Sequence, residues 1–419
     1  MDTPDVLVVG AGLAGLHTAR LLAQQGHDVL VVDRRRRLDS GIRTTGIFVR
    51  RTLEDFPVPD ELLGPPIRRV VLYPPSLRRP VELVSSRDEF RVADMAGVYA
   101  HALALAVAAG ARVRLGVAYP VAGVRARFTI GADGARSTVA RRLGLDVNRE
   151  LIVGVEEVYP VAGGLGPPTF HCVVDPRLAP GYLGWVVDDG RHAHVGLAGR
   201  PERLAGPLPE LLRAFGMAFD ASANAGSGSG LGLGLGGDAA FGAVPVGGGN
   251  SGGRPVEGGV PVGGVRSGGL PAAAGPVRRR GGPIPVGGVL RRIACPSGLL
   301  VGDAAGAVSP LTAGGLDPCL RLSSLAAAVT ADYLRTGDPA VLRHYDGAAL
   351  RARFRGRLAM RHGLSAVRSR ALTEAAFGLL RTPMGRAAAA RVLFGDGSFP
   401  DVRIERSTPL RWGASSTTR

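Results

Sequence analysis

The chain has 419 residues, which is enough for two or three domains, and 45% of them are hydrophobic, as in globular proteins. Its 51 basic residues are all arginine and outnumber the 35 acidic residues, giving a net charge of +16 that favours acidic partners. No arginine-rich helix is interleaved with aromatic residues, so we expect no nucleic acid as partner. The three cysteines lack metal-ligand spacing, so we expect no bound metal. No apolar run reaches the roughly 18 residues of a membrane span, so we expect no transmembrane helix.

The chain opens with a strand, a glycine-rich turn and a helix. Asp5–Asp33 reads DVLVVGAGLAGLHTARLLAQQGHDVLVVD, in which Gly10, Gly12 and Gly15 have G-x-G-x-x-G spacing. This pattern predicts a dinucleotide-binding unit, with a pyrophosphate at the N-terminus of the helix. Asp33 ends the second strand at the position where a carboxylate accepts hydrogen bonds from a ribose.

Four arginines, Arg34–Arg37, follow Asp33. An arginine at this point can bind the 2′-phosphate of NADP, which makes Arg34 a candidate cofactor contact. Asp33 would repel such a phosphate, so we favour a solvated charge run as the interpretation of these four residues.

Two later stretches indicate a second domain. Short β-like pieces between Val70 and Val84 are separated by prolines, as in a hairpin. Residues 151–200 alternate apolar and polar side chains, which predicts an antiparallel sheet with one covered face that shapes a substrate cavity. Three single histidines lie in this stretch, and we interpret them as structural rather than catalytic: His171, His192 and His194.

Two further strand-to-turn motifs follow the first one. Ile130–Leu145 reads IGADGARSTVARRLGL, in which a strand stops at Asp133 before a helix begins. Leu299–Asp317 reads LLVGDAAGAVSPLTAGGLD, in which an apolar strand runs into Asp303 and a glycine pair follows. In order and spacing, the three motifs resemble those of FAD-dependent oxidoreductases in the para-hydroxybenzoate hydroxylase superfamily.

The resemblance implies bound FAD and assigns roles to single residues. Asp303 would contact the ribityl chain or the pyrophosphate, and the backbone of Gly314 and Gly315 would approach the flavin ring. Arg91 resembles the arginine that the superfamily places before a helix to contact FAD, and Asp133 would brace the nucleotide-binding turns. NAD(P)H is the implied electron donor. No side chain is identified as catalytic, because the flavin itself carries the chemistry.

The third motif also indicates a branch of the superfamily. Aromatic hydroxylases carry a histidine and an asparagine where this chain has Gly306 and Asp317. Pro180–Trp185, reading PGYLGW, is instead similar to the P-x-x-Y-x-W strand of geranylgeranyl reductases, which lies near the substrate cavity. Tyr182 and Trp185 are therefore substrate-side candidates, and a role as core aromatic residues is the alternative.

Membership of this branch implies hydride transfer between reduced flavin and an apolar unsaturated substrate, isoprenoid-like or polyketide-like. The alternatives are a flavin-dependent monooxygenase that uses NAD(P)H and oxygen, and an FAD-binding protein without turnover. Many reductases of the branch have a cysteine-glycine pair in the loop after the second strand, close to the flavin. In this chain that loop, residues 43–46, reads RTTG.

Residues 221–288 are rich in glycine, and PVGG recurs at Pro245, Pro261 and Pro285. We interpret this segment as a flexible low-complexity insertion, because it buries too little apolar surface to offset the entropy of ordering it. At its end, Arg279–Pro285 resembles an arginine-glycine-isoleucine-proline element of the same branch.

The C-terminal part is predicted to be helical and rich in arginine over residues 341–406, with a disordered tail over 407–419. Contact of these arginines with an anionic membrane is one interpretation, and an ordinary solvated face is the one that we prefer. The first strand begins within a few residues of Met1, so we expect no signal peptide and a cytoplasmic location, with the inner face of the membrane as the site of any peripheral contact.

Together these elements predict an α/β fold with a discontinuous Rossmann-like FAD-binding domain, an antiparallel-sheet substrate domain and a C-terminal helical segment. The FAD-binding domain is assigned to residues 1–69, 90–150 and 289–340, and the substrate domain to residues 70–89 and 151–220. The oligomeric state is not predicted.

Overall fold

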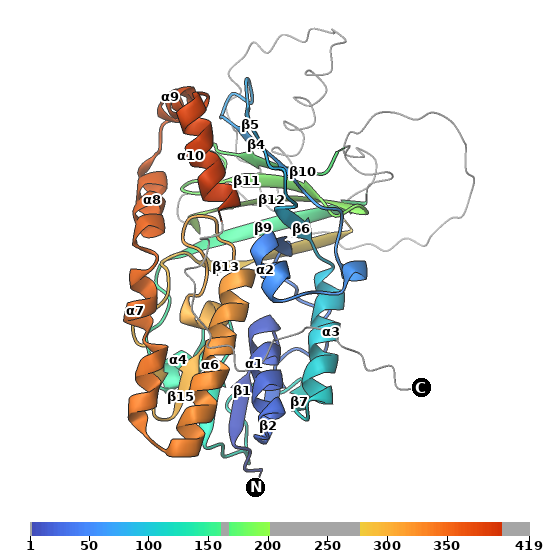
Figure 1. The fold of residues 1–419 in the computed structure, drawn as a ribbon, viewed down its shortest axis with the longest axis vertical. Helices are drawn as coiled ribbons and strands as arrows, with labels where there is room; N and C mark the ends of the chain where they lie inside the picture. The colour runs from blue at the N-terminus through green and yellow to red at the C-terminus, as the bar shows by residue number, and fades with distance from the viewer. Residues whose placement is uncertain (1, 161–166, 202–276, 396–419) are drawn as a thin grey trace, which may run out of the picture.

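A computed structural model describes residues 2–160, 167–201 and 277–395 of the protein. Figure 1 shows a six-stranded sheet in the lower half of the molecule and a seven-stranded sheet that crosses above it. The C-terminal helices run up one side and reach the upper sheet (Figure 1). The predicted fold class, an α/β fold with a Rossmann-like domain, an antiparallel sheet and a C-terminal helical segment, is confirmed.

The six-stranded sheet forms the core of the nucleotide-binding half. Its neighbouring strands pair in parallel, except at one edge where β14 and β15 are antiparallel. β1 and β2 are buried along their whole length, which is why they read as unbroken valine and leucine runs. In spatial order the strands are β14 (Ala294–Cys295), β15 (Gly298–Leu300), β8 (Phe128–Gly131), β1 (Val6–Val9), β2 (Val29–Asp33) and β7 (Arg112–Leu115).

Three long helices pack beside this sheet, and α1 contacts both of the others. They are α1 (Leu13–Gln24), α3 (Met95–Ala108) and α6 (Leu316–Thr336). Shorter helical elements complete this half: α2 (Arg50–Asp55), α4 (Thr138–Arg142) and the 3-10 helices η1 (Asp60–Leu62), η3 (Gly302–Ala305) and η4 (Pro339–Tyr345).

The seven-stranded sheet is antiparallel except where β10 pairs in parallel with β4. A two-stranded ribbon of β3 (Ile47–Val49) and β6 (Phe90–Val92) is also present. In spatial order the seven strands are β13 (Arg278–Pro285), β9 (Leu151–Pro160), β12 (His192–Gly199), β11 (Gly184–Asp188), β10 (Thr169–Val173), β4 (Arg69–Tyr73) and β5 (Val81–Val84).

Strand β13 differs from the sequence prediction, which assigned residues 221–288 to a flexible insertion. Residues 278–285 instead pair along their whole length with β9, from Arg278 opposite Val158 to Pro285 opposite Leu151. Backbone hydrogen bonds to β9, rather than burial of side chains, hold this glycine-containing strand in place. Residues 221–276 of the predicted insertion lie outside the described residues, as do residues 202–220 of the predicted substrate domain.

Four helices follow the nucleotide-binding half: α7 (Gly347–Ala352), α8 (Arg355–Ala366), α9 (Arg370–Leu380) and α10 (Pro383–Phe394). Phe377 of α9 is buried against Val81 and Leu83 of β5, so the C-terminal helices cover the hairpin edge of the upper sheet. Residues 396–419, including the predicted tail, lie outside the described residues. Within the described part of the chain, no helix has both the length and the apolar character needed to cross a bilayer.

Candidate functional site

The turn between β1 and α1 is closed by contacts that exclude side chains. Gly10 has φ of +112°, and a Cβ atom on it would collide with the carbonyl of Ala132 at the end of β8. A Cβ atom on Gly15 would collide with the carbonyl oxygen of Gly10. The two glycines therefore allow α1 to lie directly against the ends of β1 and β8, as the motif predicts.

Gly12 has a different environment, because a Cβ atom on it would meet no atom within 4 Å. It is the N-cap residue of α1, and no side chain caps that helix. By contrast, the side chains of Asp94 and Ser137 cap α3 and α4 by accepting hydrogen bonds from backbone amides of the first turn. The first turn of α1 thus presents amide groups and the positive end of the helix dipole to an open space, which suits a pyrophosphate.

The Asp33 carboxylate is held at the end of β2 by four hydrogen bonds. The Ala11 amide donates to it at 2.8 Å, and Arg35 donates through its own amide at 2.8 Å, Nε at 3.1 Å and Nη2 at 2.9 Å. Burial alone raises the pKa of Asp33, but the hydrogen bonds from Arg35 and Ala11 outweigh it and hold the pKa below its ordinary value. The candidate Arg34 is exposed, and Arg35 is the arginine that reaches Asp33.

Asp303 lies in η3, directly after β15. Among the described residues, no group donates a hydrogen bond to its carboxylate, and burial raises its pKa to about 6. The Asn148 side chain holds the backbone of this turn by donating to Asp303 O at 2.8 Å and to Ala135 O at 3.0 Å. A carboxylate in this state is suited to accept hydrogen bonds from ligand hydroxyl groups.

The glycine pair begins α6. Gly315 is the N-cap residue of this helix, which has no side-chain cap, and a Cβ atom on Gly315 would lie 3.7 Å from Oδ1 of Asp303. Gly314 accepts a hydrogen bond from the Ser309 amide at 2.9 Å, which closes the preceding loop. The structure thus brings Asp303 and the α6 N-terminus together, as the third motif implies.

Tyr99 is a residue of this region that the sequence motifs did not indicate. The guanidinium of Arg35 lies 5.9 Å from the centre of its ring. Burial raises the pKa of Tyr99 to about 12, and the charges of Arg35, Asp303 and Arg280 also act on its hydroxyl. Tyr99 therefore lies beside the arginine that holds Asp33 and within electrostatic reach of Asp303. A phenol within a mostly apolar helix is the only sequence signal for it.

Arg91 and Asp133 are both engaged with the chain itself. Nε of Arg91 donates to Gly64 O at 2.8 Å, and its other nitrogens contact Leu63 O and Asp60. Contact of Arg91 with FAD stays a prediction. The Asp133 carboxylate accepts hydrogen bonds from the first amides of α4, at 2.6 and 3.2 Å, and so braces the turn after β8.

These residues fit FAD. FAD is a dinucleotide with hydroxyl groups between its phosphates and its ring. The N-termini of α1 and α6 have no side-chain caps, and the space above Gly12 is open, which suits the phosphates. The Asp303 carboxylate has no hydrogen-bond donor among the described residues, which suits the hydroxyl groups. Gly10, Gly12 and Gly15 would hold the pyrophosphate, Asp33 the adenine ribose and Asp303 the ribityl chain. When bound, FAD supplies hydride-transfer chemistry.

The two aromatic candidates lie at the boundary between the upper sheet and the nucleotide-binding half. The Tyr182 hydroxyl donates to the carbonyl of Thr312, in the loop before the glycine pair. Trp185 packs on Gly196, where a Cβ atom would overlap the indole ring, and its Nε1 donates to Oε2 of Glu156 at 3.2 Å. Their contact with substrate stays a prediction.

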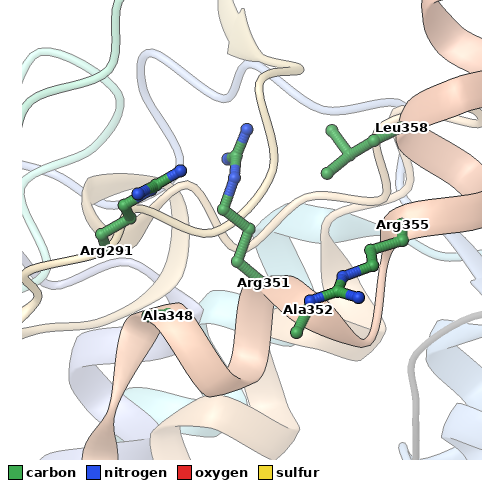
Figure 2. A pocket seen from close by; sticks show the side chains of 6 residues that line it. All are labelled: Arg291, Ala348, Arg351, Ala352, Arg355 and Leu358. Carbon is green, nitrogen blue, oxygen red and sulfur yellow. The ribbon is translucent and has the colours of Figure 1, made fainter.

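A pocket of about 290 Å³ lies elsewhere, where α7 meets α8 (Figure 2). None of the candidate cofactor residues lines it. One of the residues that line it, Arg351, donates through Nη1 to the carbonyl of Val289 at 3.1 Å and so helps to hold the chain before β14. The pocket is lined by Arg291, Ala348, Arg351, Ala352, Arg355 and Leu358.

Comparisons with known proteins agree with the geometry. Residues 3–56 match a family model described as an FAD binding domain. Digeranylgeranylglycerophospholipid reductase 1 of Methanopyrus kandleri is 30% identical over 372 residues, which cover 80% of this chain and 82% of the relative. A solved geranylgeranyl bacteriochlorophyll reductase-like protein of Thermoplasma acidophilum superposes with a TM-score of 0.72 at 20% identity, covering 94% of this chain and 98% of that chain.

A probable FAD-dependent monooxygenase of Pseudomonas aeruginosa also has this fold, with a TM-score of 0.60 at 19% identity over 90% of this chain and 100% of its own. At that identity the likeness shows a shared fold only. The identity and coverage of the Methanopyrus reductase are those of a family member. The chain belongs to the geranylgeranyl reductase family of FAD-dependent oxidoreductases.

Proposed function

We propose that this oxidoreductase transfers hydride from reduced flavin to the double bonds of a polyprenyl lipid. The observation that carries the proposal is the apolar cluster between the upper sheet and the loop before the glycine pair. Ile152, Tyr182, Ala198 and Val286 form its core, and Ala313 of the loop packs against them. Apolar side chains at this boundary suit an isoprenoid chain better than a polar aromatic substrate. The name of the Methanopyrus relative, a digeranylgeranylglycerophospholipid reductase, supports the same substrate class.

The test is an anaerobic incubation of the reduced holoenzyme with a geranylgeranyl glycerophospholipid in detergent micelles, followed by mass spectrometry of the lipid. Each reduced double bond adds one pair of hydrogen atoms to the product. A monooxygenase would instead add oxygen to the lipid in air and leave it unchanged without air. An FAD-binding protein without turnover would leave it unchanged in both conditions.

We propose NAD(P)H as the electron donor, on the basis of the resemblance alone. Anaerobic addition of NADPH to the holoenzyme, followed by visible absorbance, tests this step separately from lipid reduction. Bleaching of the flavin band supports the proposal. If NADPH leaves the band unchanged while dithionite removes it, another donor reduces this enzyme.

We also propose peripheral contact with the inner face of an anionic membrane through α9 and α10. Leu372 and Leu379 are 58% and 72% exposed and lie seven residues apart, on one face of α9. Met384 at the start of α10 is 84% exposed, and Arg381 lies between the two helices. Exposed apolar side chains beside arginine are the features of an interfacial helix.

Sedimentation with vesicles tests this contact. The wild type should bind vesicles that contain phosphatidylglycerol more strongly than vesicles of phosphatidylcholine alone, and Leu379→Glu should weaken that binding. Val107→Glu is the matched control, because Val107 is 53% exposed on α3, away from α9 and α10. Equal binding of both vesicle types by all three proteins would contradict the proposal.

A further inference from the structure

A buried arginine of α8 has no anion beside it. Arg361 is 3% exposed, and its Nη1 atom donates to the carbonyl of Gly181, in the turn before β11. Its guanidinium lies 5.8 Å from the centre of the Tyr182 ring. Within the described part of the chain no carboxylate forms an ion pair with Arg361, although the charge of Glu150 acts on it. A buried cation in this state is costly, because one carbonyl and one ring replace only part of its hydration.

A second arginine lies beside the same turn. Arg200 directly follows β12, is half-buried, and donates its amide to the carbonyl of Pro180 at 3.1 Å. A Cβ atom on Gly181 would lie 3.9 Å from Nε of Arg200 and 3.5 Å from the Cα atom of Ser365 on α8. Arg200 and α8 therefore flank the same glycine. The side chain of Arg200 pairs with no carboxylate among the residues that the structure describes.

A third arginine reaches the region from α8. Arg357 is half-buried and lies one turn before Arg361, with Nη1 3.3 Å from Oγ of Ser309. Oγ of Ser309 also accepts a hydrogen bond from the Thr312 hydroxyl at 2.9 Å, and the Thr312 carbonyl accepts one from the Tyr182 hydroxyl. Arg357 is thus linked through the loop before the glycine pair to the tyrosine that Arg361 contacts.

Electrostatics also favour an anion between these side chains. Burial lowers the pKa of Arg361, and the positive charge of Arg200 lowers it further. Burial likewise lowers the pKa of Arg357. A negative ligand would remove the repulsion between the guanidinium groups and would replace the hydration that burial removes.

The three arginines lie next to apolar surface. Tyr182 and Ala313 belong to the apolar cluster that carries the proposed function, together with Ile152. The hydroxyl of this tyrosine bonds to the loop that Arg357 contacts, and its ring lies beside Arg361. A ligand that satisfies both features has an apolar chain that ends in an anionic group.

We propose that Arg200, Arg357 and Arg361 form a binding site for a phosphate group. Guanidinium groups bind phosphate oxygens through paired N–H donors, and three positive charges match a phosphate better than a singly charged carboxylate. Arg361 would supply the most buried donors, and the two half-buried arginines would supply the outer ones. The phosphate belongs either to the head group of the lipid or to free phosphate, and the experiments below distinguish the two. The lipid assignment rests on the proposed function, whereas the phosphate site itself does not.

The first test is calorimetric titration of the FAD-loaded protein with pyrophosphate. Bound FAD occupies the turn at Gly12, so pyrophosphate cannot bind there. Arg361→Gln and Arg200→Gln should each raise the dissociation constant at least about tenfold, because each removes a charged donor. Arg355→Gln is the matched control, because Arg355 is an exposed arginine of the same helix that lines the pocket of Figure 2. Unchanged binding in both site variants, or a loss confined to Arg355→Gln, would overturn the proposal.

Thermal unfolding keeps the test decisive if Arg361→Gln folds poorly. Arg200 is half-buried and its side chain has no partner among the described residues, so Arg200→Gln should fold. Without pyrophosphate its Tm should equal or exceed that of the wild type, because a repulsion with Arg361 is removed. Pyrophosphate should raise the Tm of the wild type and should raise that of Arg200→Gln much less. An equal rise in both proteins would contradict the site.

The last test identifies the source of the phosphate. Lipid reduction is measured with the geranylgeranyl glycerophospholipid and with geranylgeraniol, which has the same chain and a hydroxyl in place of the phosphate. If the site holds the lipid head group, Arg200→Gln should raise KM for the phospholipid at least about tenfold and leave kcat and the KM for the alcohol unchanged. If pyrophosphate binding is lost while this KM is unchanged, the ligand is free phosphate.

Failure of this inference and failure of the proposed function give different results. If the wild type reduces neither lipid, polyprenyl reduction is wrong, and the pyrophosphate titration still decides whether the phosphate site exists. If the wild type reduces both lipids while the site variants bind pyrophosphate and phospholipid normally, the three arginines are structural only.

Discussion

Thr45 donates a hydrogen bond to Glu156, which lies 111 residues later in the chain. The first residue belongs to the loop after β2, and the second lies on β9 of the upper sheet. The contact joins the nucleotide-binding half to the antiparallel sheet. The buried Glu156 carboxylate thereby holds the Thr45 hydroxyl in place.

The open space at Gly12 predicts a variant that folds but binds the cofactor poorly. Gly12→Ala should cost the apoprotein only about 1 kcal/mol or less in the free energy of unfolding, the difference between Gly and Ala at an N-cap, since the new methyl meets no atom within 4 Å. Its dissociation constant for FAD should rise at least tenfold, because the methyl occupies the approach to the helix N-terminus. Urea unfolding and FAD fluorescence titration measure the two quantities.

Gly15→Ala is the matched comparison in the same turn. Its methyl collides with the Gly10 carbonyl, so the apoprotein itself should lose about 2 kcal/mol or more of stability. Equal effects of the two substitutions on unfolding would contradict the assignment of Gly12 to cofactor approach and Gly15 to packing.

FAD binding should depend on pH through Asp303. Its raised pKa of about 6 means that the buried carboxyl is mostly protonated at pH 5 and mostly ionised at pH 7. Hydroxyl groups donate to the ionised form, so the affinity for FAD should rise about tenfold between these pH values. Asp303→Asn should bind FAD more weakly and should lose this part of the pH dependence. An identical pH profile in the variant would show that Asp303 does not face the cofactor.

Stability should depend on pH through His194 of β12, whose two ring nitrogens lie 3.1 Å from Oε1 of Glu156 and 3.0 Å from Oδ2 of Asp189. Its folded-state pKa of about 9 lies above the unfolded value of 6.5, so its contribution is fully present below pH 6.5 and is lost as the pH rises through 9. The loss is at most about 3.4 kcal/mol, because each tenfold difference in proton affinity between the folded and unfolded states corresponds to roughly 1.36 kcal/mol. Urea unfolding at pH 7 and pH 10 should show a smaller loss in Asp189→Asn than in the wild type. Equal losses in both proteins would mean that Asp189 does not raise the pKa of His194.

The two neighbouring arginines after β2 should behave differently. Arg35→Ala removes the two side-chain donors to Asp33, Nε and Nη2, and leaves the backbone donors in place. We expect a loss of about 1–3 kcal/mol in unfolding free energy, because a buried carboxylate loses its charged partner. Arg34→Ala, at an exposed position, should change it by about 0.5 kcal/mol or less. The reverse order in urea unfolding would contradict the pairing.

The cofactor half was predictable because its signals are local. Gly10, Gly12 and Gly15 lie within six consecutive residues, and Asp303 directly follows an apolar strand, so the turns could be placed without knowing the rest of the fold. Which of four adjacent arginines reaches Asp33 was not predictable, since that depends on how the chain leaves β2. The favoured interpretation of a solvated run holds for Arg34, which is exposed, but not for Arg35.

The buried pair of Glu156 and His194, 3.1 Å apart, could not be predicted, because it depends on strand register. Glu156 lies opposite Gly196, and His194 lies opposite Val158, so the two side chains meet diagonally across an antiparallel pair. Neither residue has an unusual sequence neighbourhood, and His194 was interpreted as a structural histidine. For the same reason the end of the glycine-rich segment was misassigned, since β13 is defined by its pairing with β9 rather than by its own composition.

The anaerobic visible spectrum of the dithionite-reduced holoenzyme after addition of the geranylgeranyl glycerophospholipid tests polyprenyl reduction directly. The oxidised flavin band should return with the unsaturated lipid and should not return with the saturated lipid of the same chain length. A flavin that stays reduced with both lipids, in a protein that binds FAD, would contradict polyprenyl reduction as the function of this chain.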